Sequence, residues 1–171
     1  MKEDKALLPF KSSNTLVKYQ YDRLKKIFLD VYISLKNDKI DFTKNIIYDN
    51  KQDISSPMVA LNSIFDSIKN EKVFIITVDT PLISQKTIEK IVSSSQNFEI
   101  TVAKTNKDKI HSLCGVFSKK LQPQVDQYIK QNIHKIGLLI KNHKTHIIEC
   151  KNGAEFLNIN KKEDYLKALK R

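Results

Sequence analysis

The chain has 171 residues, of which 40% are apolar and 29% are charged. This length allows one well-buried core, and no apolar stretch approaches the roughly 20 residues that a membrane helix requires. The net charge is +11, and Arg23 and Arg171 are the only arginines among 30 basic residues. Because sequence-specific readers of nucleic acids depend on arginine forks, these scattered lysines favour a solvated surface or a polyanionic ligand over nucleic acid binding.

Two cysteines, Cys114 and Cys150, lie in strand-like runs. We expect both to be reduced core residues, with a disulfide or a metal pair as the alternative. The first ten residues alternate charged and apolar groups and show no secretory signal, and no membrane segment is visible. The expected compartment is therefore the cytoplasm.

Short β runs alternate with amphipathic helical patterns in the first half of the chain, which is typical of βαβ units. An apolar stripe at helical spacing predicts a helix over residues 15–28, with Asn14 as its N-cap. Short strands are expected at residues 31–35 and 45–48. Pro57 suits the first turn of a helix that presents one apolar face, made by Met58, Leu61, Ile64, Phe65 and Ile68.

The most informative segment covers residues 73–78, which are nearly all apolar and end abruptly at Asp79, Thr80 and Pro81. Such a run predicts a buried, central strand of a parallel sheet. Open α/β sheets bind ligands at the carboxyl ends of their strands, and a carboxylate there needs a cation, hydrogen-bond donors or water. We therefore predict that Asp79 holds a Mg²⁺ ion that carries nucleotide phosphates.

The second half of the chain continues the alternation. Ser84 is the expected N-cap of a helix ending near residue 94, and Asn160 that of the last helix. Strands are predicted at residues 98–103, 110–117 and 146–150, and helices at 119–131, 134–142 and 161–169. The whole pattern predicts an α/β fold with a three-layer α/β/α arrangement and a mostly parallel central sheet, in one domain spanning residues 1–171.

Glycine is scarce: the three glycines are Gly115, Gly137 and Gly153. No glycine-rich phosphate loop of the P-loop or dinucleotide type is therefore present. The histidines do not form a zinc pattern, and no Gly-x-Ser-x-Gly elbow of a hydrolase occurs.

Four blocks, in order along the chain, resemble the molybdenum cofactor guanylyltransferases, which belong to the glycosyltransferase-like nucleotidyltransferases. They are MKEDKALLPF at residues 1–10, VDTPLI at 78–83, IHSLCGVF at 110–117, and FLNIN at 156–160 followed by KKEDY. Each block is weakly specific, but their order and spacing cover essentially the whole chain. The resemblance implies a Rossmann-like nucleotidyltransferase fold and transfer of GMP from GTP to Mo-molybdopterin, with Mg²⁺ as cofactor. Other cofactor biosynthesis proteins and molybdoenzymes are the further partners that it implies.

The resemblance also implies residue roles. Asp79 falls on the metal ligand, and Lys5 on the lysine that contacts nucleotide phosphates. Ser34 and Asp49 fall on positions that contact the nucleotide. The acceptor side of the pocket is matched by His111, Asn158 and Asn160.

Each of these residues also has a purely structural interpretation. Asp79 and Asp49 suit turns, Lys5 suits a solvated surface, Asn160 suits a helix cap and His111 suits a hydrogen-bonded strand position.

The chain departs from the family pattern in three places. The family begins with a strand and the loop LAGGxSxRMG, whereas this chain resembles the family only from the Met of that loop onward. Glycines of the family's G-P-[LM]-x-G are replaced around Pro57, and His-Pro-Leu becomes His111-Ser112-Leu113. A sheet without its first strand would leave backbone groups unpaired. The alternatives are therefore a truncated or non-catalytic relative that binds nucleotide or cofactor, and a related transferase with another base or acceptor.

Overall fold

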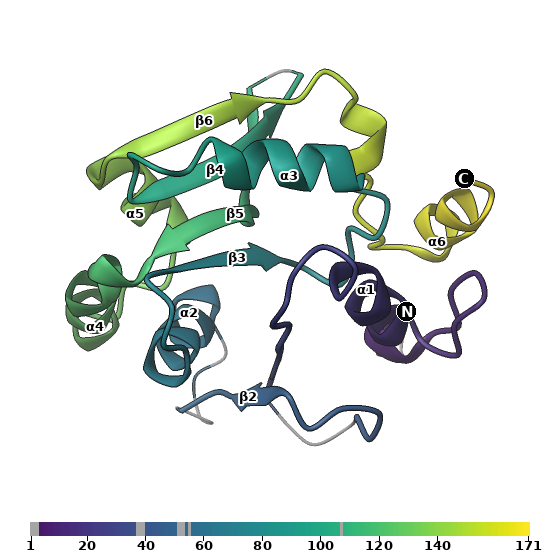
Figure 1. Cartoon of the computed structure of the whole chain (residues 1–171), viewed down its shortest axis with the longest axis horizontal. Coiled ribbons are helices and arrows are strands. Elements are labelled where there is room, and N and C mark those ends of the chain that lie inside the picture. Colours follow the sequence, from purple (N-terminus) through teal and green to yellow (C-terminus); the bar gives the residue numbers. More distant parts are fainter. Residues whose placement is uncertain (1–3, 37–39, 51–53, 55, 107) are drawn as a thin grey trace.

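The computed structural model describes residues 4–36, 40–50, 54, 56–106 and 108–171. Strands and helices alternate along much of the chain, as the sequence predicts, and the strands form two sheets (Figure 1). The strands are β1 (Ile33–Leu35), β2 (Ile46–Tyr48), β3 (Lys72–Ile76), β4 (Ile100–Thr105), β5 (Lys109–Ser118) and β6 (Thr145–Glu149). The α-helices are α1 (Leu16–Leu24), α2 (Pro57–Ser67), α3 (Gln85–Ser93), α4 (Gln122–Lys130), α5 (Ile136–Asn142) and α6 (Lys162–Leu169). Short 3₁₀ turns are η1 (Lys5–Leu7), η2 (Lys119–Leu121) and η3 (Gly153–Phe156).

The larger sheet has the strand order β3-β5-β4-β6. Strand β5 is antiparallel to both of its neighbours, and β6 is parallel to β4. Strands β3, β4 and β6 therefore point the same way, which confirms the α/β class and the mostly parallel sheet. Strands β1 and β2 form a separate parallel pair.

One expectation about this sheet is wrong. The segment at residues 73–78 was expected to be the central, fully buried strand, but β3 is an edge strand of the larger sheet and each of its five residues is only half-buried. The residues of β3 are only half-buried because β5 covers one edge of the strand and, within the described residues, no strand covers the other edge. The apolar side chains of β3 consequently line a hollow in addition to packing against the two core clusters.

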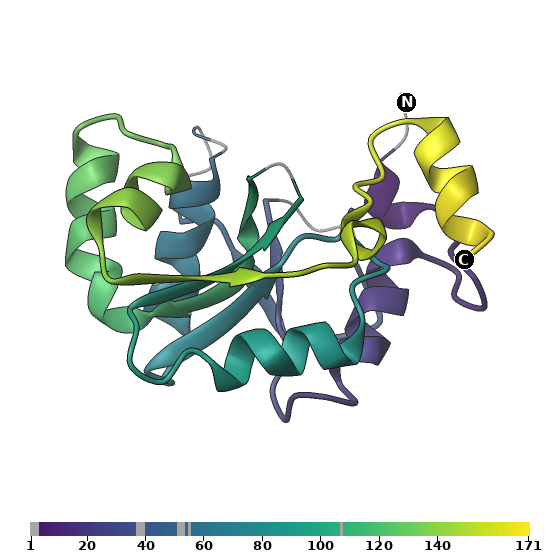
Figure 2. The ribbon, with the colours of Figure 1, turned by 90° about the horizontal axis from the view of Figure 1, so that it is seen from above.

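Helices cover both faces of the larger sheet (Figure 2). On one face, α2, α4 and α5 pack against β4 and β5 around Phe65, Phe117 and Leu139, all fully buried. On the other face, α3 and the end of α1 pack against β3, β5 and β6. This arrangement confirms the three-layer prediction and is expected from the alternating amphipathic pattern.

The two ends of the chain meet beside the sheet. Phe10 and Leu16 share a buried cluster with Ile159 and Ala168, and the views show α1 and α6 at the same end of the molecule (Figures 1 and 2). The hydroxyl of Tyr165 donates to the carbonyl of Pro9. This contact brings the first and last sequence blocks together at the carboxyl end of β3.

Two helix caps are confirmed and two differ. Pro57 is the first residue of α2, and the Ser84 hydroxyl accepts a hydrogen bond from the Thr87 N–H at the start of α3. Helix α1 is capped by Thr15 instead of Asn14. At α6, the Asp164 carboxylate accepts from the backbone N–H groups of residues 160 and 161, so the Asn160 side chain is not the cap.

Cys114 and Cys150 are free, buried thiols, as expected for core residues. Burial raises the pKa of Cys114 to about 12, so this thiol stays protonated. No helix in the described parts of the chain is long and apolar enough to cross a membrane.

Candidate functional site

A tight turn follows β3 and carries Asp79. The backbone N–H and the hydroxyl of Thr80 both donate to the carbonyl of Thr77. From α1, the buried Gln20 amide reaches the carbonyls of Thr77 and Thr80 at 3.3 and 3.4 Å. The turn is thus braced by a helix that precedes it by about 60 residues, which fixes where the carboxylate of Asp79 can lie.

The C-terminal segment crosses directly over this turn. The Ile159 N–H donates to the backbone carbonyl of Asp79 at 2.8 Å. Asn158 and Asn160 flank that bond, and the Asn160 side-chain oxygen accepts from the Lys5 ammonium group at 3.1 Å. The structure therefore gathers Lys5, Asp79, Asn158 and Asn160 at one end of β3, although the chain separates Lys5 from Asn160 by 155 residues.

Two oxygen atoms in this group have no protein partner. Oδ1 of Asp79 and Oδ1 of Asn158 are buried and accept no hydrogen bond from the described residues. Buried acceptors without donors are costly, and they mark places where an ion, water or ligand is expected. These oxygens suit a Mg²⁺ ion, which binds one or two carboxylates and completes its shell with phosphates and water.

A purely protein-made metal cage does not occur among the described residues, because no three His, Cys, Asp or Glu side chains cluster there. The donor set at Asp79 therefore fits a metal that arrives with a phosphate ligand better than a permanently held structural metal.

His111 lies next to the same C-terminal segment. Its Nε2 atom is 2.9 Å from the Thr105 hydroxyl, and its ring centroid is 4.4 Å from that of Phe156. Burial, followed by the nearby Lys109 charge, lowers the pKa of His111, so the ring is neutral near pH 7. Phe156 links His111 to the two asparagines, but no hydrogen bond among the described residues joins them directly.

Ser34 and Asp49 lie apart from the Asp79 group. Ser34 is exposed on β1, and the N–H of Asp49 donates to the Leu35 carbonyl at 3.1 Å. Oδ1 of Asp49 is buried without a partner in the described chain, and this burial raises the pKa of Asp49 despite the nearby Lys36 charge. The two predicted nucleotide contacts are thus together on the small sheet, with no described contact to Asp79. The first sequence block, at residues 1–10, falls partly on residues 1–3, which are outside the described residues.

A basic pocket beside the turn was not foreseen from the sequence. It has a volume of about 230 Å³, and the basic residues Lys11, Arg23 and Arg171 line it together with one acidic residue, Glu155. Arg23 donates to the Ile83 carbonyl, while its Nε and Nη2 atoms are buried and have no protein partner in the described chain. The available signal was that Arg23 is one of two arginines in a lysine-rich chain.

Gln20 and Glu155 were also missed. Gln20 is a polar residue on the otherwise apolar face of α1, which was the sign of a buried hydrogen-bonding role. The Glu155 carboxylate accepts from the Ser84 N–H at 3.1 Å and from the Thr87 hydroxyl at 2.8 Å. It therefore fixes the C-terminal segment to the start of α3, just after the Asp79 turn.

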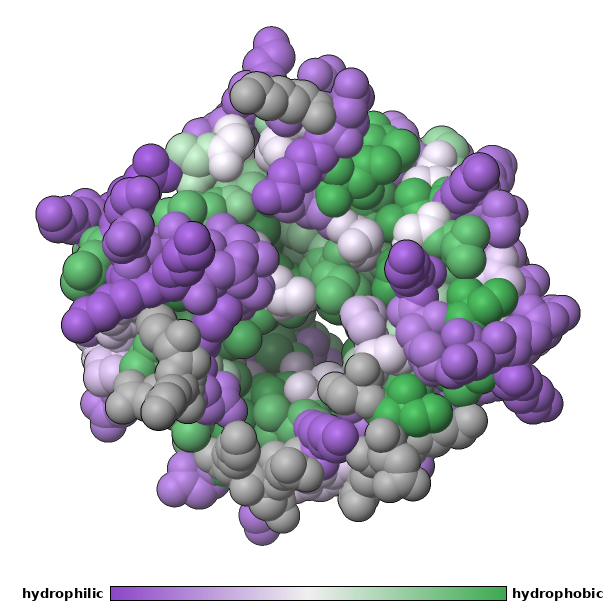
Figure 3. Space-filling model, turned by 180° about the vertical axis from the view of Figure 1, so that it is seen from behind, coloured by the Kyte–Doolittle hydropathy of each residue, from purple (hydrophilic) through white to green (hydrophobic). Residues whose placement is uncertain are grey.

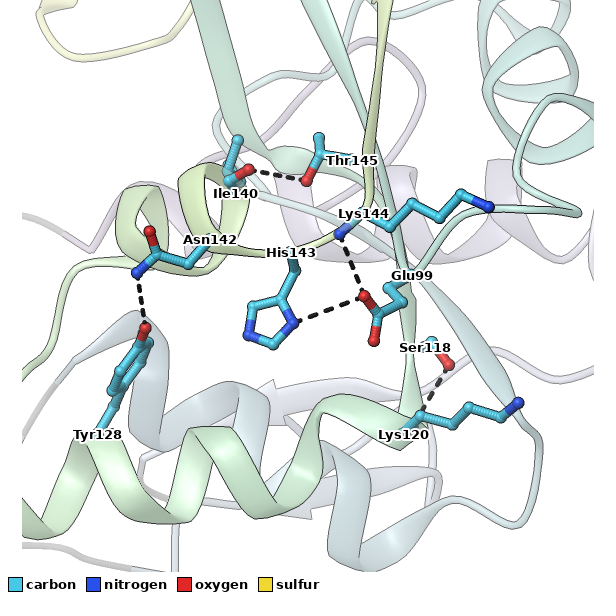
Figure 4. Close-up of polar contacts among 9 residues, drawn as sticks. All are labelled: Glu99, Ser118, Lys120, Tyr128, Ile140, Asn142, His143, Lys144 and Thr145. Atoms are coloured by element: carbon cyan, nitrogen blue, oxygen red, sulfur yellow. Dashed lines mark hydrogen bonds and ion pairs between the residues drawn. The ribbon is translucent and has the colours of Figure 1, made fainter.

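His143 lies outside this site and has structural surroundings. His143 lies 3.6 Å from the Glu99 carboxylate, which also accepts from the Lys144 N–H (Figure 4). Tyr128 and Asn142 join α4 to α5 in the same corner. This corner lies where β4 begins, at the opposite end of the strand from the expected ligand edge, and its contacts hold the helix layer on the sheet.

Comparisons with known proteins show the family of this chain. The family described as MobA-like NTP transferase domain matches residues 1–146. A molybdenum cofactor guanylyltransferase of Campylobacter jejuni subsp. doylei is 38% identical over 169 residues, which are 98% of this chain and 87% of that protein. One of Helicobacter pylori is 32% identical over 162 residues, covering 95% of this chain and 76% of the relative.

A solved structure shows the same fold. The crystal structure of molybdopterin-guanine dinucleotide biosynthesis protein A from Archaeoglobus fulgidus superposes with a TM-score of 0.70. It is 12% identical in sequence, and the match covers 99% of this chain and 90% of that one. The sequence relatives and the fold together show that this chain belongs to the MobA-like nucleotidyltransferases and, within them, to the molybdenum cofactor guanylyltransferase family.

Proposed function

We propose that the chain transfers GMP from GTP to Mo-molybdopterin, forming the guanine dinucleotide form of the cofactor and pyrophosphate. The observation that carries this proposal is the 38% identity, over 98% of the chain, to a protein named for that activity. A phosphate oxygen of the acceptor forms a bond to the α-phosphorus of GTP. The bond between that phosphorus and the oxygen leading to the β-phosphate breaks, and pyrophosphate leaves with the electron pair.

The residues around Asp79 suit this reaction. The acceptor phosphate is ionised at neutral pH, so the reaction needs no general base. His111 is therefore proposed to contact the acceptor and not to transfer a proton. Lys5 supplies a positive charge that Asn160 orients, and such a charge stabilises negative charge developing on transferred phosphates. Nucleotidyltransferases of this type typically use a divalent metal. A bound Mg²⁺ would neutralise the triphosphate, with Asp79 as its ligand and Asn158 as a neighbouring oxygen donor.

The other site residues receive roles by position. Ser34 and Asp49 would contact the nucleotide from the small sheet, and Asn158, Asn160 and His111 would form the acceptor side. The basic pocket at Arg23 is adjacent to the turn and suits the anionic groups of either substrate.

Residues 1–171 are proposed to act as one domain, because the C-terminal segment supplies part of the Asp79 site. The two free thiols favour a reducing compartment, and we propose the cytoplasm.

A non-catalytic relative that binds nucleotide or cofactor is the second candidate. The observation in its favour is the open hollow between β1 and β3, which separates Ser34 and Asp49 from the Asp79 group. Binding of GTP without release of pyrophosphate would support this candidate.

The decisive variant is Asp79→Asn, which keeps the size of the side chain and removes its charge. We expect pyrophosphate release from GTP and Mo-molybdopterin to fall by roughly 10²-fold or more, with an unchanged unfolding midpoint. Asp108→Asn is the matched control, since Asp108 is exposed and pairs only with Lys104 among the described ion pairs. Equal activity of both variants would remove Asp79 from the site.

A further inference from the structure

Gln20 is a buried polar residue in apolar surroundings. It lies on α1 and is 4% exposed, and its neighbours Leu16 and Val17 are buried as well. Gln20 and Val17 border the hollow between β1 and β3, and Figure 3 shows the apolar lining of this hollow. Because a buried amide is costly unless its polar atoms find partners, the contacts of Gln20 indicate its role.

The Gln20 amide joins the two sides of the turn that carries Asp79. Its Nε2 atom lies 3.3 Å from the carbonyl oxygen of Thr77 and 3.4 Å from that of Thr80. Thr77 is two residues before Asp79 and Thr80 is one residue after it, and a side-chain amide has two N–H donors, one for each carbonyl. One point on α1 therefore holds the backbone on both sides of Asp79. Both bonds are at the long end of the usual range, so we expect them to contribute more to the position of the turn than to the free energy of folding.

Other carbonyls of the same segment are also held by distant parts of the chain. The Ile159 N–H donates to the carbonyl of Asp79 at 2.8 Å, and Arg23, which follows Gln20 by one turn of α1, donates to the carbonyl of Ile83. By contrast, Oδ1 of Asp79 is buried and accepts no hydrogen bond from the described residues. The backbone around Asp79 is thus fixed by α1 and by the C-terminal segment, while this carboxylate oxygen is left for a ligand.

We propose that Gln20 is a positioning residue for the Asp79 site. Its amide keeps the turn in the conformation in which the carboxylate can bind the metal that arrives with the nucleotide phosphates. A ligand group that is already ordered binds more tightly, because its ordering does not have to accompany binding. This role rests on the proposed metal contact of Asp79, and it acts through the backbone of the turn.

The test variant is Gln20→Met, which keeps a long, unbranched side chain and removes both N–H donors. We expect it to weaken the binding of GTP in the presence of Mg²⁺ about tenfold, measured by calorimetry, because the two hydrogen bonds that hold the turn are lost. The unfolding midpoint should stay unchanged. The control is Gln127→Met on α4, where the side chain is exposed and accepts from Gln124, and it should leave GTP binding unchanged.

Amide exchange gives a second readout, without nucleotide or metal. The Thr80 N–H donates to the Thr77 carbonyl inside the turn. We expect this N–H to exchange faster in Gln20→Met than in the unchanged chain, while the amides of β4 exchange at the same rate in both. A local change of this kind reports the conformation of the turn and not the stability of the whole fold.

A double-mutant cycle tests whether Gln20 acts through Asp79. In a chain that already carries Asp79→Asn, the positioned carboxylate is gone, so we expect Gln20→Met to change GTP affinity by less than about twofold. Independent effects of the two substitutions would multiply instead.

Three results would overturn the positioning role. The first is unchanged GTP affinity in Gln20→Met although Asp79→Asn weakens binding, which would leave the metal contact of Asp79 in place. The second is an equal effect of Gln20→Met with and without Asp79→Asn. The third is a lowered unfolding midpoint with faster exchange throughout β4, which would assign Gln20 to general stability. If Asp79→Asn alone leaves GTP affinity unchanged, the proposed metal contact itself fails, and the role of Gln20 fails with it.

Discussion

The larger sheet and the small sheet of this chain contrast in how completely they are packed. In the larger sheet, β4 has a strand on both sides and helices on both faces, and its residues Ile100 and Val102 are fully buried. In the small sheet, β1 and β2 pair with each other over three residues and with no other described strand, and Tyr32 and Tyr48 are exposed. A strand is stabilised by neighbours on both edges as much as by its own apolar sequence.

The contrast extends to the candidate site. The Asp79 turn is built by the larger sheet, α1 and the C-terminal segment, and its backbone is held by several hydrogen bonds. Ser34 on β1 and Asp49 just after β2 lie with the small sheet, across the hollow between β1 and β3. The predicted phosphate and metal contacts therefore rest on the better-packed region, and the predicted nucleotide contacts rest on the less packed one.

The largest expected difference between the regions comes from a matched pair of phenylalanines. Phe65 on α2 is fully buried in the main core. Phe74 on β3 is half-buried, lines the hollow between β1 and β3, and stacks on Phe28 with ring centroids 5.5 Å apart. We expect Phe65→Ala to lower the free energy of unfolding by about 3–5 kcal/mol, and Phe74→Ala by less than half as much. Urea unfolding of both variants measures this difference. Equal losses would mean that β3 is as tightly packed as the core.

A second pair tests how closely the backbones approach within the larger sheet. A Cβ atom at Gly115 on β5 would overlap the Thr101 carbonyl oxygen and lie 2.8 Å from Cγ1 of Val102. We expect Gly115→Ala to cost about 2–4 kcal/mol of unfolding free energy, because neighbouring backbone must shift. Gly137→Ala is the control, because nothing lies within 4 Å of a Cβ there. It should be neutral or stabilise α5 by up to about 1 kcal/mol. A neutral Gly115→Ala would contradict this picture of β5.

A smaller loss of unfolding free energy is expected at Glu155, where the C-terminal segment contacts the start of α3. Burial by itself raises the pKa of Glu155, but hydrogen bonds from Ser84, Thr87 and Asn152 outweigh it, and the net pKa is lowered. A carboxylate with a lowered folded-state pKa stabilises the fold above its unfolded pKa of about 4.3, and this stabilisation is lost as the pH falls through the folded-state value.

The test is Glu155→Gln, which we expect to lower the free energy of unfolding by about 1–2 kcal/mol at neutral pH. The difference from the unchanged chain should shrink toward about pH 3. Glu89→Gln is the control, because Glu89 is exposed and only accepts from Gln85 among the described hydrogen bonds. A pH-independent loss in Glu155→Gln would show that the amide fails for steric reasons instead.

Much of the fold was predictable from the chain because its signals are local. Helix α2 begins at Pro57 and α3 is capped by Ser84, as expected from short-range chemistry. Apolar spacing predicted the strands to within a few residues. The exact capping residue was not predictable in two helices. Thr15 caps α1 in place of Asn14, and Asp164 caps α6 in place of Asn160. Several polar residues near a helix start can accept from the same N–H groups, so the sequence does not decide which of them is the cap.

The sequence by itself determined the element order, the α/β class and the resemblance to a nucleotidyltransferase family, because periodicity and short motifs depend on residues close together in the chain. Only the tertiary structure decided that β3 is an edge strand, that Lys5 reaches Asn160, and that Arg23 and Gln20 brace the surroundings of Asp79. Those facts depend on which distant segments pack together. Strand pairing and burial depend on the whole chain. An apolar run such as residues 73–78 therefore predicts a strand, but it does not predict whether that strand has a neighbour on each edge.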